Sequence, residues 1–361
     1  MDVPVTESEL EAAALVCPSC QASVTTGEQF CEACGASLGA EPPAAAEPPA
    51  AAEPVAAGEA CASCGGRYAA DGYCENCGAR KPNPRDHFTE QPASWVAGVC
   101  DKGIRHARNE DAMALAADDV PGSRVVLVVC DGVTSAIDSD IASLAAARAA
   151  RDVLGVSRAQ GLGIESSRLS AMTARLNAAA DAANDAVAAA TPADVAGNPP
   201  SCTFVAAVAE GTLLLAGSVG DSRAYWLPDD GQPLMLTTDD SFAAEQIAAG
   251  VPRHEAEHGP QAHAITRWLG VDGPEHTPRS TSMEITGAGW LLACSDGLWN
   301  YCSEPTDIAD LVRRTAADHG GDPLATAEAL VAFANDQGGQ DNITAALARF
   351  DTPTTNEKGA D

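Results

Sequence analysis

Short apolar runs separated by polar turns dominate the chain after residue 94. Runs of this length without polar alternation are typical of strands that are buried on both faces of a sheet. We therefore predict strands in these runs, which span residues 95–100, 111–117, 124–131, 202–210, 212–227, 289–296 and 343–350. The step Glu210-Gly211 between two of them predicts a hairpin, and therefore antiparallel pairing.

Longer segments with helical periodicity lie between these runs, at residues 137–154, 166–190, 305–318 and 323–335. In the helix predicted at 137–154, four residues lie on neighbouring faces, namely Ile141, Leu144, Ala145 and Arg148. The last two begin at prolines, which the first turn of a helix tolerates because its N–H is unpaired there in any case. Helices that come in pairs predict a layer covering a sheet, which is an α+β organisation.

Eight of the 13 cysteines form four Cys-x-x-Cys pairs before residue 78, arranged as an internal repeat. The first unit contains Cys17, Cys20, Cys31 and Cys34, and the second contains Cys61, Cys64, Cys74 and Cys77. Two such turns can direct four thiolates at one tetrahedral Zn²⁺, which closes its shell and makes it structural. Disulfides and a redox role are the alternatives. The units resemble the double zinc-ribbon modules of many bacterial proteins, which implies two zinc ions.

Composition divides the chain into successive segments. A Pro-, Ala- and Glu-rich stretch between the cysteine units predicts an extended spacer. We expect zinc ribbon 1 at 13–38, the linker at 39–58, zinc ribbon 2 at 59–80, a connector at 81–93, a large domain at 94–351 and a disordered tail at 352–361.

The chain has 361 residues and a formal charge of −30, from 21 Lys and Arg against 51 Asp and Glu. So acidic a surface repels nucleic acid and anionic membranes, and neither is expected as a partner. No apolar run approaches the roughly 20 residues of a membrane span, and the acidic N-terminal segment is unlike a signal peptide. We expect a cytoplasmic monomer. In such a reducing compartment the other five cysteines are expected to act as small buried hydrophobes.

Carboxylates stand where several of the predicted strands begin or end. Two buried strands run into Asp-Gly, acidic residues precede two others, and Asp221 lies inside a strand pair; the set is Glu110, Asp111, Asp131, Asp221, Asp296 and Asp341. Carboxylates gathered at one end of a core repel one another and raise one another's pKa. Divalent cations remove that conflict, and oxygen ligands without a nearby histidine cluster favour Mg²⁺ or Mn²⁺ over Zn²⁺.

The motifs resemble those of the metal-dependent serine/threonine phosphatases of the type 2C family, bacterial branch. They are, in order, RNEDA at 108–112, CDGV at 130–133, GDSRAY at 220–225, LTTDDS at 236–241, TRWLG at 266–270, SDGLW at 295–299 and QDNIT at 340–344. The resemblance implies a four-layer α/β/β/α sandwich with two antiparallel sheets and a two-metal centre at one end.

The resemblance also implies a role for each carboxylate. Asp131 bridges both metals; Glu110 and the Gly132 carbonyl hold one, and Asp296 and Asp341 hold the other. Asp111 hydrogen-bonds metal waters, and Asp221 with Asp296 marks a possible third Mn²⁺ or Mg²⁺. The implied reaction is hydrolysis of a phosphoserine or phosphothreonine monoester by a metal-activated water.

The chain departs from the family pattern at two positions. His106 stands where the family places a phosphate-clamping arginine, and Arg105 and Arg108 are the candidate replacements, with solvated surface charge as the alternative. Val133 stands where animal members place a candidate general acid, so we expect water to protonate the leaving oxygen. The histidines between residues 254 and 276 are interpreted as loop polarity rather than a metal site.

Two other interpretations stay open. The large domain could be a catalytically weak scaffold or sensor that acts through its ribbons, or its carboxylates could be ordinary turn residues. In each case the long spacer suggests that the ribbons recruit a partner protein for signalling. Deletion of residues 1–90 is then expected to leave turnover of a small substrate intact.

Overall fold

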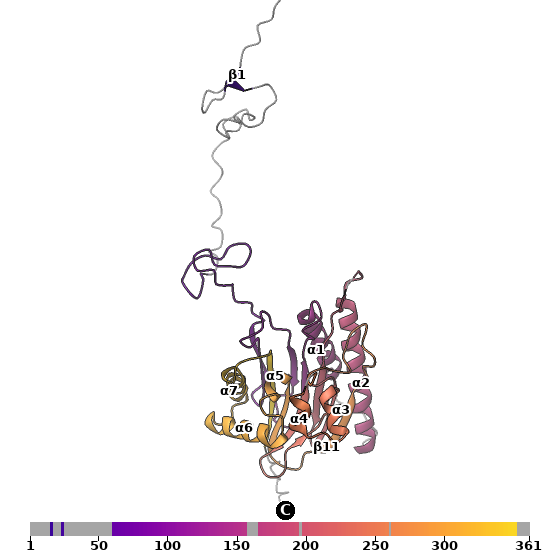
Figure 1. Ribbon diagram of the computed structural model, residues 1–361. Helices are drawn as coiled ribbons and strands as arrows, with labels where there is room; N and C mark the ends of the chain where they lie inside the picture. The colour runs from indigo at the N-terminus through magenta and orange to yellow at the C-terminus, as the bar shows by residue number, and fades with distance from the viewer. Residues whose placement is uncertain are drawn as a thin grey trace, which may run out of the picture. The chain divides into compact units, whose positions relative to one another are not determined.

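The computed structural model describes residues 15–16, 23–24, 60–156, 165–194, 197–259 and 261–351. The chain divides into two compact units, Met1–Lys81 and Pro82–Asp361. Figure 1 shows the second unit as a body of strands flanked by helices. The cysteines of the first predicted ribbon and the predicted tail at 352–361 lie outside the described residues.

Two antiparallel sheets form the centre of the unit Pro82–Asp361. The first has the strand order β10-β9-β12-β13-β4-β3 and the second the order β11-β8-β7-β6-β5. The strands of the first sheet are β3 (His87–Ala93), β4 (Val96–Asp101), β9 (Arg223–Pro228), β10 (Leu234–Met235), β12 (Gly289–Cys294) and β13 (Ile343–Phe350). Those of the second are β5 (Ala112–Ala117), β6 (Arg124–Cys130), β7 (Phe204–Glu210), β8 (Leu213–Val219) and β11 (Arg279–Glu284).

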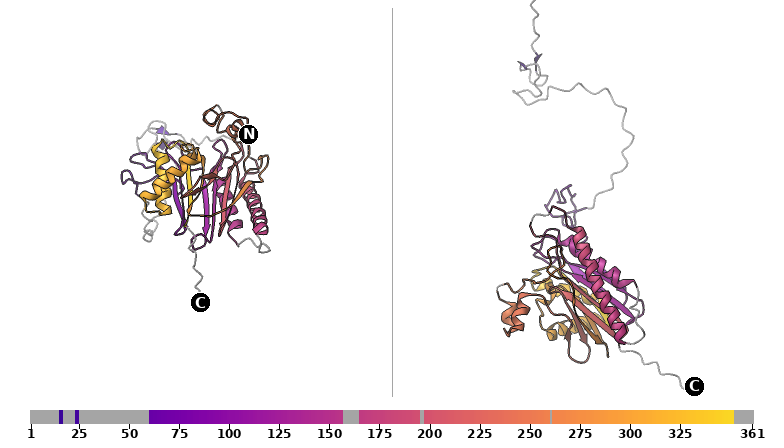
Figure 2. Two further views of the ribbon diagram at one scale, coloured as in Figure 1. Left: turned by 90° about the horizontal axis from the view of Figure 1, so that it is seen from below. Right: turned by 90° about the vertical axis from the view of Figure 1, so that its right-hand side faces the viewer.

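Helices cover the outer face of each sheet (Figures 1 and 2). α1 (Ser139–Gly155) and α2 (Glu165–Ala190) pack together on the second sheet, and α6 (Pro305–Asp318) and α7 (Pro323–Asp336) pack on the first. Three shorter helices are α3 (Phe242–Ala248), α4 (Arg253–Glu257) and α5 (Asp296–Trp299). The fold expectation, two antiparallel sheets with paired helices, is confirmed.

Strand β6 shows why its sequence is apolar at every position after Arg124. Alternate side chains of a strand point to opposite faces of the sheet. Val126 and Val128 enter the core beneath α1 and α2, whereas Leu127 and Val129 enter the core between the two sheets. Because both faces are covered, the positions from Val125 to Cys130 are all apolar, and the strand leads directly to Asp131.

Two local expectations are corrected. In α1 the buried face is formed by small residues, including Ala142, Ala146 and Ala150, while Ile141 is half exposed. The alanines let the helix approach the sheet closely, so residue size alone did not mark the inner face. The connector expected over 81–93 is shorter, because its residues 87–93 form the edge strand β3, whose largely polar sequence hides the strand pattern.

At the N-terminus, β1 (Leu15–Val16) pairs antiparallel with β2 (Ser23–Val24). Within the described part of the chain, no helix has both the length and the apolar character needed to cross a membrane.

Candidate metal centre and zinc ribbon

Five segments that are distant in sequence meet at one end of the sandwich. β6 ends at Cys130, which pairs with Ala112 at the start of β5, so Asp131 and Asp111 leave the second sheet side by side. β12 ends at Cys294, opposite Ala345 near the start of β13, and this pairing brings the residues after β12 next to those before β13. The turn between β8 and β9, which contains Asp221, lies at the same end.

Asp131 is fixed by the neighbouring strand connection. Its backbone N–H donates to the Thr203 hydroxyl at 3.0 Å, and its carbonyl accepts from the Thr203 N–H at 2.7 Å. The next residue has no room for a side chain, because a Cβ on Gly132 would lie 2.6 Å from the Glu110 carbonyl oxygen. Glycine here lets the segment carrying Glu110 approach Asp131, so the Asp-Gly step has a packing cause as well as a chemical one.

Asp111 is buried and held by two hydroxyl donors. Its Oδ2 accepts from Ser295 and from Thr344, each at 2.7 Å. Its other carboxylate oxygen is buried without a partner among the described residues, and so is Oδ1 of Asp296. A buried carboxylate oxygen without a donor is costly, and a cation or its water is the group that would satisfy it.

Glu110 lies in the most heavily contacted part of the site. Arg108 donates to its Oε1 through two nitrogens, at 3.0 and 2.7 Å, and the Ser139 hydroxyl donates to the same oxygen at 2.5 Å. His106 lies between Glu110 and Asp341, 3.7 Å from the first carboxylate and 3.2 Å from the second. Oε1 of Glu110 is therefore occupied by donors, Oε2 faces His106, and Glu110 is not among the residues that line the cavity described below.

Burial and mutual repulsion raise the pKa of the carboxyls at this end. For Asp111, burial first and then Asp341 and Asp296 raise the pKa to about 7, against the hydroxyl donors. For Asp296, burial and Asp341 raise it to about 6. The pKa values of Asp131 and Asp221 rise well above their usual range, again through burial and then the neighbouring carboxylates. This is the conflict between charges that bound divalent cations would relieve.

A cavity of about 270 Å³ opens onto these groups, and the side chains of Asp131, Asp221, Asp296 and Asp341 line it together with Gly132. Three ligand atoms of these carboxylates do not all lie within 4.8 Å of one another, since among the described residues only the four cysteines of the second ribbon meet that condition. The carboxylate oxygens are thus gathered around one cavity without converging on a single point as the ribbon sulfurs do. The donor set, oxygen atoms alone, suits Mn²⁺ or Mg²⁺.

The two candidate phosphate-binding arginines differ in their contacts. Arg108 is paired with Glu110 and lies 3.8 Å from Asp140. The side chain of Arg105 is exposed and has no hydrogen bond or ion pair with any described residue. Its backbone N–H donates to the Gly339 carbonyl, which holds this segment next to the loop that carries Asp341.

His263, which the sequence analysis interpreted as loop polarity, lines the carboxylate cavity from the segment after α4. No local pattern links this residue to strand ends more than 30 positions away, so only the fold reveals it. The neighbouring His254 and His258 are exposed, and their rings stack with centroids 4.2 Å apart. They belong to no metal-ligand group among the described residues.

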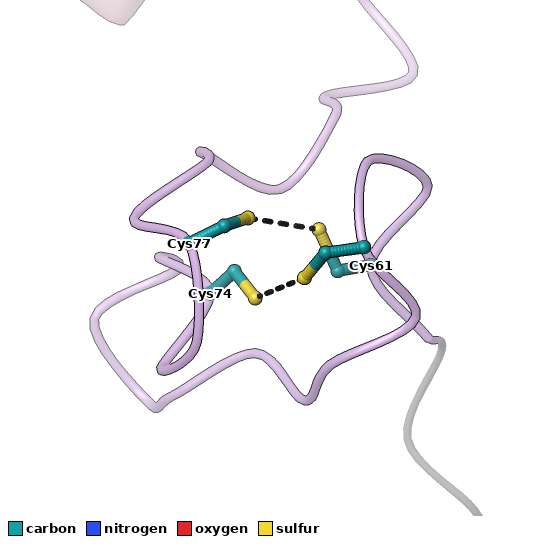
Figure 3. Close-up of side chains that lie close together, drawn as sticks. Cys61, Cys74 and Cys77 are labelled. Carbon is teal, nitrogen blue, oxygen red and sulfur yellow. Dashed lines mark hydrogen bonds between the residues drawn. The ribbon is translucent and has the colours of Figure 1, made fainter.

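The second predicted ribbon brings together Cys61, Cys64, Cys74 and Cys77 (Figure 3). The sulfur atoms of Cys61 and Cys77 lie 3.7 Å apart, and those of Cys64 and Cys74 lie 3.5 Å apart. A disulfide would need about 2.05 Å, whereas four thiolates around Zn²⁺, each with a bond of about 2.3 Å, have tetrahedral edges of nearly 3.8 Å. The sulfurs therefore fit zinc.

The two Cys-x-x-Cys turns of this ribbon have the same backbone geometry. The N–H of Gly65 donates to the Cys61 carbonyl at 2.7 Å, and that of Gly78 to the Cys74 carbonyl at 2.8 Å. Both glycines have φ of +72°, a left-handed conformation that favours glycine. Burial raises the pKa of Cys61, but hydrogen bonds led by that from Tyr68 outweigh it and bring the pKa to about 6, which favours the thiolate that zinc binds.

Comparison with known proteins agrees with both parts of the molecule. A family model described as protein phosphatase 2C matches residues 104–333, and a zinc-ribbon domain model matches residues 16–38. The two-sheet fold with a carboxylate cavity at one end is therefore of the phosphatase type. The chain belongs to the protein phosphatase 2C family.

Individual relatives match part of the chain. Serine/threonine phosphatase stp of Listeria monocytogenes serotype 4b is 31% identical over 162 residues, 44% of this chain and 59% of that protein. Protein phosphatase PhpP of Streptococcus pneumoniae is 37% identical over 131 residues, 36% of this chain and 50% of that protein. The match to these curated relatives therefore spans only about half of their length.

Solved structures match a larger share of the chain than these relatives do. The Mycobacterium tuberculosis serine/threonine phosphatase PstP/Ppp aligns with a TM-score of 0.57 and 27% identity, over 71% of this chain and 98% of that one. The catalytic domain of PstP in complex with two manganese ions aligns with a TM-score of 0.54 and 27% identity, over 71% and 98%.

Proposed function

We propose that the chain is a metal-dependent protein serine/threonine phosphatase that hydrolyses phosphoserine and phosphothreonine monoesters. The observation that supports this most strongly is the buried group of carboxylates around one cavity at the end of a protein phosphatase 2C sandwich. Unpartnered oxygens and raised pKa values in this group fit cations as the missing partners. A divalent cation there supplies a water of lowered pKa as the nucleophile and offsets charge on the phosphoryl oxygens.

We propose a separate role for each of the candidate cation ligands. Asp131 is proposed as the ligand shared by two cations, with Glu110 and the Gly132 carbonyl completing one site and Asp296 and Asp341 the other. Asp221, beside Asp296, is the proposed ligand of a third. A structural relative in complex with two manganese ions supports this pair of cation sites.

Asp111 is proposed to orient the attacking water. Its Oδ2 is already taken by Ser295 and Thr344, so only the buried Oδ1 remains to accept a hydrogen bond. Arg105 is the guanidinium that the contacts favour for the phosphate, because Arg108 is occupied by Glu110 and helps to hold that carboxylate in place. Water is the proposed donor of the proton to the leaving oxygen.

For the N-terminal unit we propose one structural zinc per ribbon, two in the chain, and a role in recruiting a partner protein. The sulfur geometry of the second ribbon supports the proposal of a structural zinc ion there. The division of the chain into two compact units, Met1–Lys81 and Pro82–Asp361, supports the proposed recruiting role. A cytoplasmic monomer involved in signalling is the setting that we propose.

A weakly active scaffold or sensor is the second candidate. The observation that favours it is His106, which stands between Glu110 and Asp341 at the position where the family carries an arginine. A histidine there clamps phosphate less firmly than a guanidinium does.

Hydrolysis of p-nitrophenyl phosphate with and without Mn²⁺ tests the proposal. We expect turnover that requires Mn²⁺ and that falls at least about 100-fold in Asp131→Asn, because the shared ligand is lost. Turnover without added metal in chelated protein, or full activity of Asp131→Asn, would refute it. Manganese binding by calorimetry without turnover of any phosphopeptide would support the scaffold instead.

A further inference from the structure

A second cavity, of about 480 Å³, adjoins the carboxylate cavity. The two share four lining residues, Val133, Ser135, His263 and Ile265. We call the second one the side cavity. Because the two cavities have a common border, a molecule whose phosphate lies against the carboxylates can extend into the side cavity.

The walls of the side cavity are tied to the segment that follows Asp131. The N–H of Val133 donates to the Ser201 carbonyl at 3.0 Å, and the N–H of Ile137 donates to the Asn198 carbonyl at 3.2 Å. On the other side, Leu269 and Cys202 exchange two backbone hydrogen bonds, of 2.8 and 3.1 Å. These bonds hold the walls at a fixed distance from the carboxylates, so the side cavity is preformed.

The lining mixes apolar and polar side chains and includes one carboxylate. Trp268 and Pro199 provide apolar surface, and Asp272 provides a carboxylate. The Trp268 indole N–H donates to Oδ1 of Asp272 at 3.0 Å, and no described residue donates to the second oxygen. Among the described residues, neither a lysine nor an arginine lines either cavity. The side cavity is thus negative, within a chain of formal charge −30.

Neighbouring cations do not neutralise Asp272. Arg267, the closest in sequence, donates one nitrogen to Asp240 and another to the Thr277 carbonyl. His276 is paired with Asp181 at 3.0 Å. The carboxylate of Asp272 therefore keeps its charge available to a ligand.

We propose that the side cavity binds a lysine or arginine side chain of the substrate, located within a few residues of the phosphorylated serine or threonine. These side chains combine an aliphatic stem with a terminal cation. The stem packs on Trp268 and Pro199, and the cation pairs with Asp272, with a further attraction to the indole ring. This inference rests on the proposed phosphatase activity and specifies its substrate as a basic phosphopeptide.

The experiment uses the full-length chain loaded with Mn²⁺. Phosphothreonine peptides that differ only in one residue (Arg, Ala or Glu), placed in turn at each of the three positions on either side, are compared by kcat/KM. At the position that reaches the side cavity we expect Arg to exceed Ala by about fivefold, the effect of one partly exposed ion pair, and Glu to be poorest. Asp272→Asn should remove the preference, and Asp272→Lys should invert it toward Glu.

Glu275→Gln is the matched control, because this exposed carboxylate is on the same loop, outside the side cavity, with only a 4.0 Å contact to Arg267. It should keep the preference. Glu275→Gln should also hydrolyse p-nitrophenyl phosphate at the wild-type rate, and the melting temperature with Mn²⁺ shows whether each of the three variants folds. An Arg preference retained in Asp272→Asn, or no preference at any position in the wild type, overturns the proposal. Calorimetric binding of the same peptides tests the preference even without turnover, so failure of the phosphatase activity is a separate result.

Discussion

The hydroxyl of Ser295 donates a 2.7 Å hydrogen bond to the Asp111 carboxylate and thereby joins the two sheets at the candidate metal centre. Ser295 follows β12 of one sheet, and Asp111 precedes β5 of the other. The bond is fully buried. Asp111 therefore depends on both sheets for its position, and its orientation reports how well they are packed together.

Ser295→Ala tests this link. The variant leaves Asp111 with one hydroxyl donor and removes the Ser295 oxygen that accepts from the Thr344 N–H at 2.9 Å. We expect the free energy of unfolding to fall by about 1–3 kcal/mol, the range for buried hydrogen bonds to a charged group. Urea denaturation with Mn²⁺ present measures it. Ser303→Ala, which lies outside the carboxylate group, is the comparison for activity, and equal activity of the two variants would contradict an orienting role of Asp111.

Acidification is expected to stabilise the metal-free large unit, residues 82–361. The folded-state pKa values of Asp111 and Asp296, about 7 and about 6, exceed the ordinary value of 3.8. Protonation therefore favours the folded state, and this stabilisation is complete below about pH 4 and is lost as the pH rises through 6 to 7.

We expect the melting temperature without metal to be higher at pH 5 than at pH 8 by about 5 °C, and Mn²⁺ to raise it more at pH 8. Differential scanning calorimetry at the two pH values measures both effects. Asp131→Asn should show a smaller pH difference, because one of the repelling carboxyls is gone. A metal-free unit that is more stable at pH 8 would be inconsistent with the raised pKa values.

The two arginines are expected to affect different steps. Arg105→Ala should raise the KM for phosphopeptide and the inhibition constant of inorganic phosphate by about tenfold, with little change in the Mn²⁺ requirement. Arg108→Ala should raise the Mn²⁺ concentration for half-maximal activity by about tenfold, because Glu110 loses the donor that orients it. Steady-state kinetics across a Mn²⁺ series separates the two, and the opposite pattern would exchange their roles.

The sequence was most informative where burial leaves one choice of residue. β6 lies between two cores, so every side chain from Val125 to Cys130 is apolar and the carboxylate that follows stands out. The sequence was least informative about the edge strands of the two sheets. β3 and β11 are largely exposed edge strands with polar sequences, so they lack the pattern of a buried strand.

The carboxylates other than Asp221, which lies inside the predicted run 212–227, could be predicted because each follows or precedes a recognisable strand. The side cavity could not, since Val133, Asn198 and Trp268 come from three connections whose meeting depends on the fold. The assignment of individual ligands to individual cations likewise stays a prediction.

Cys74→Ser is expected to remove about one zinc ion per chain while the kcat for p-nitrophenyl phosphate stays at the wild-type value. Its thiolate is one of four that converge, and three ligands hold structural zinc less tightly. Metal analysis by mass spectrometry after dialysis measures the zinc. Ser63→Ala, an exposed position in the other cysteine turn, is the matched control and should retain the metal. Unchanged zinc content in Cys74→Ser would exclude a zinc ribbon at this position.

Removal of the N-terminal ribbons should leave catalytic activity intact only if the truncated chain keeps the whole large unit. A chain starting at residue 82 keeps Arg85, whose guanidinium donates to the Asp111 carbonyl at 2.6 Å, and keeps β3, where Glu90 accepts from the Leu115 N–H at 2.8 Å. We expect this fragment to hydrolyse p-nitrophenyl phosphate at the wild-type rate. A chain starting at residue 91 loses both contacts and leaves β4 as an unpaired edge. We expect it to melt at a lower temperature and to lose most of its activity, in contrast to the expectation drawn from the sequence. Equal activity of the two fragments would show that β3 and Arg85 do not support Asp111.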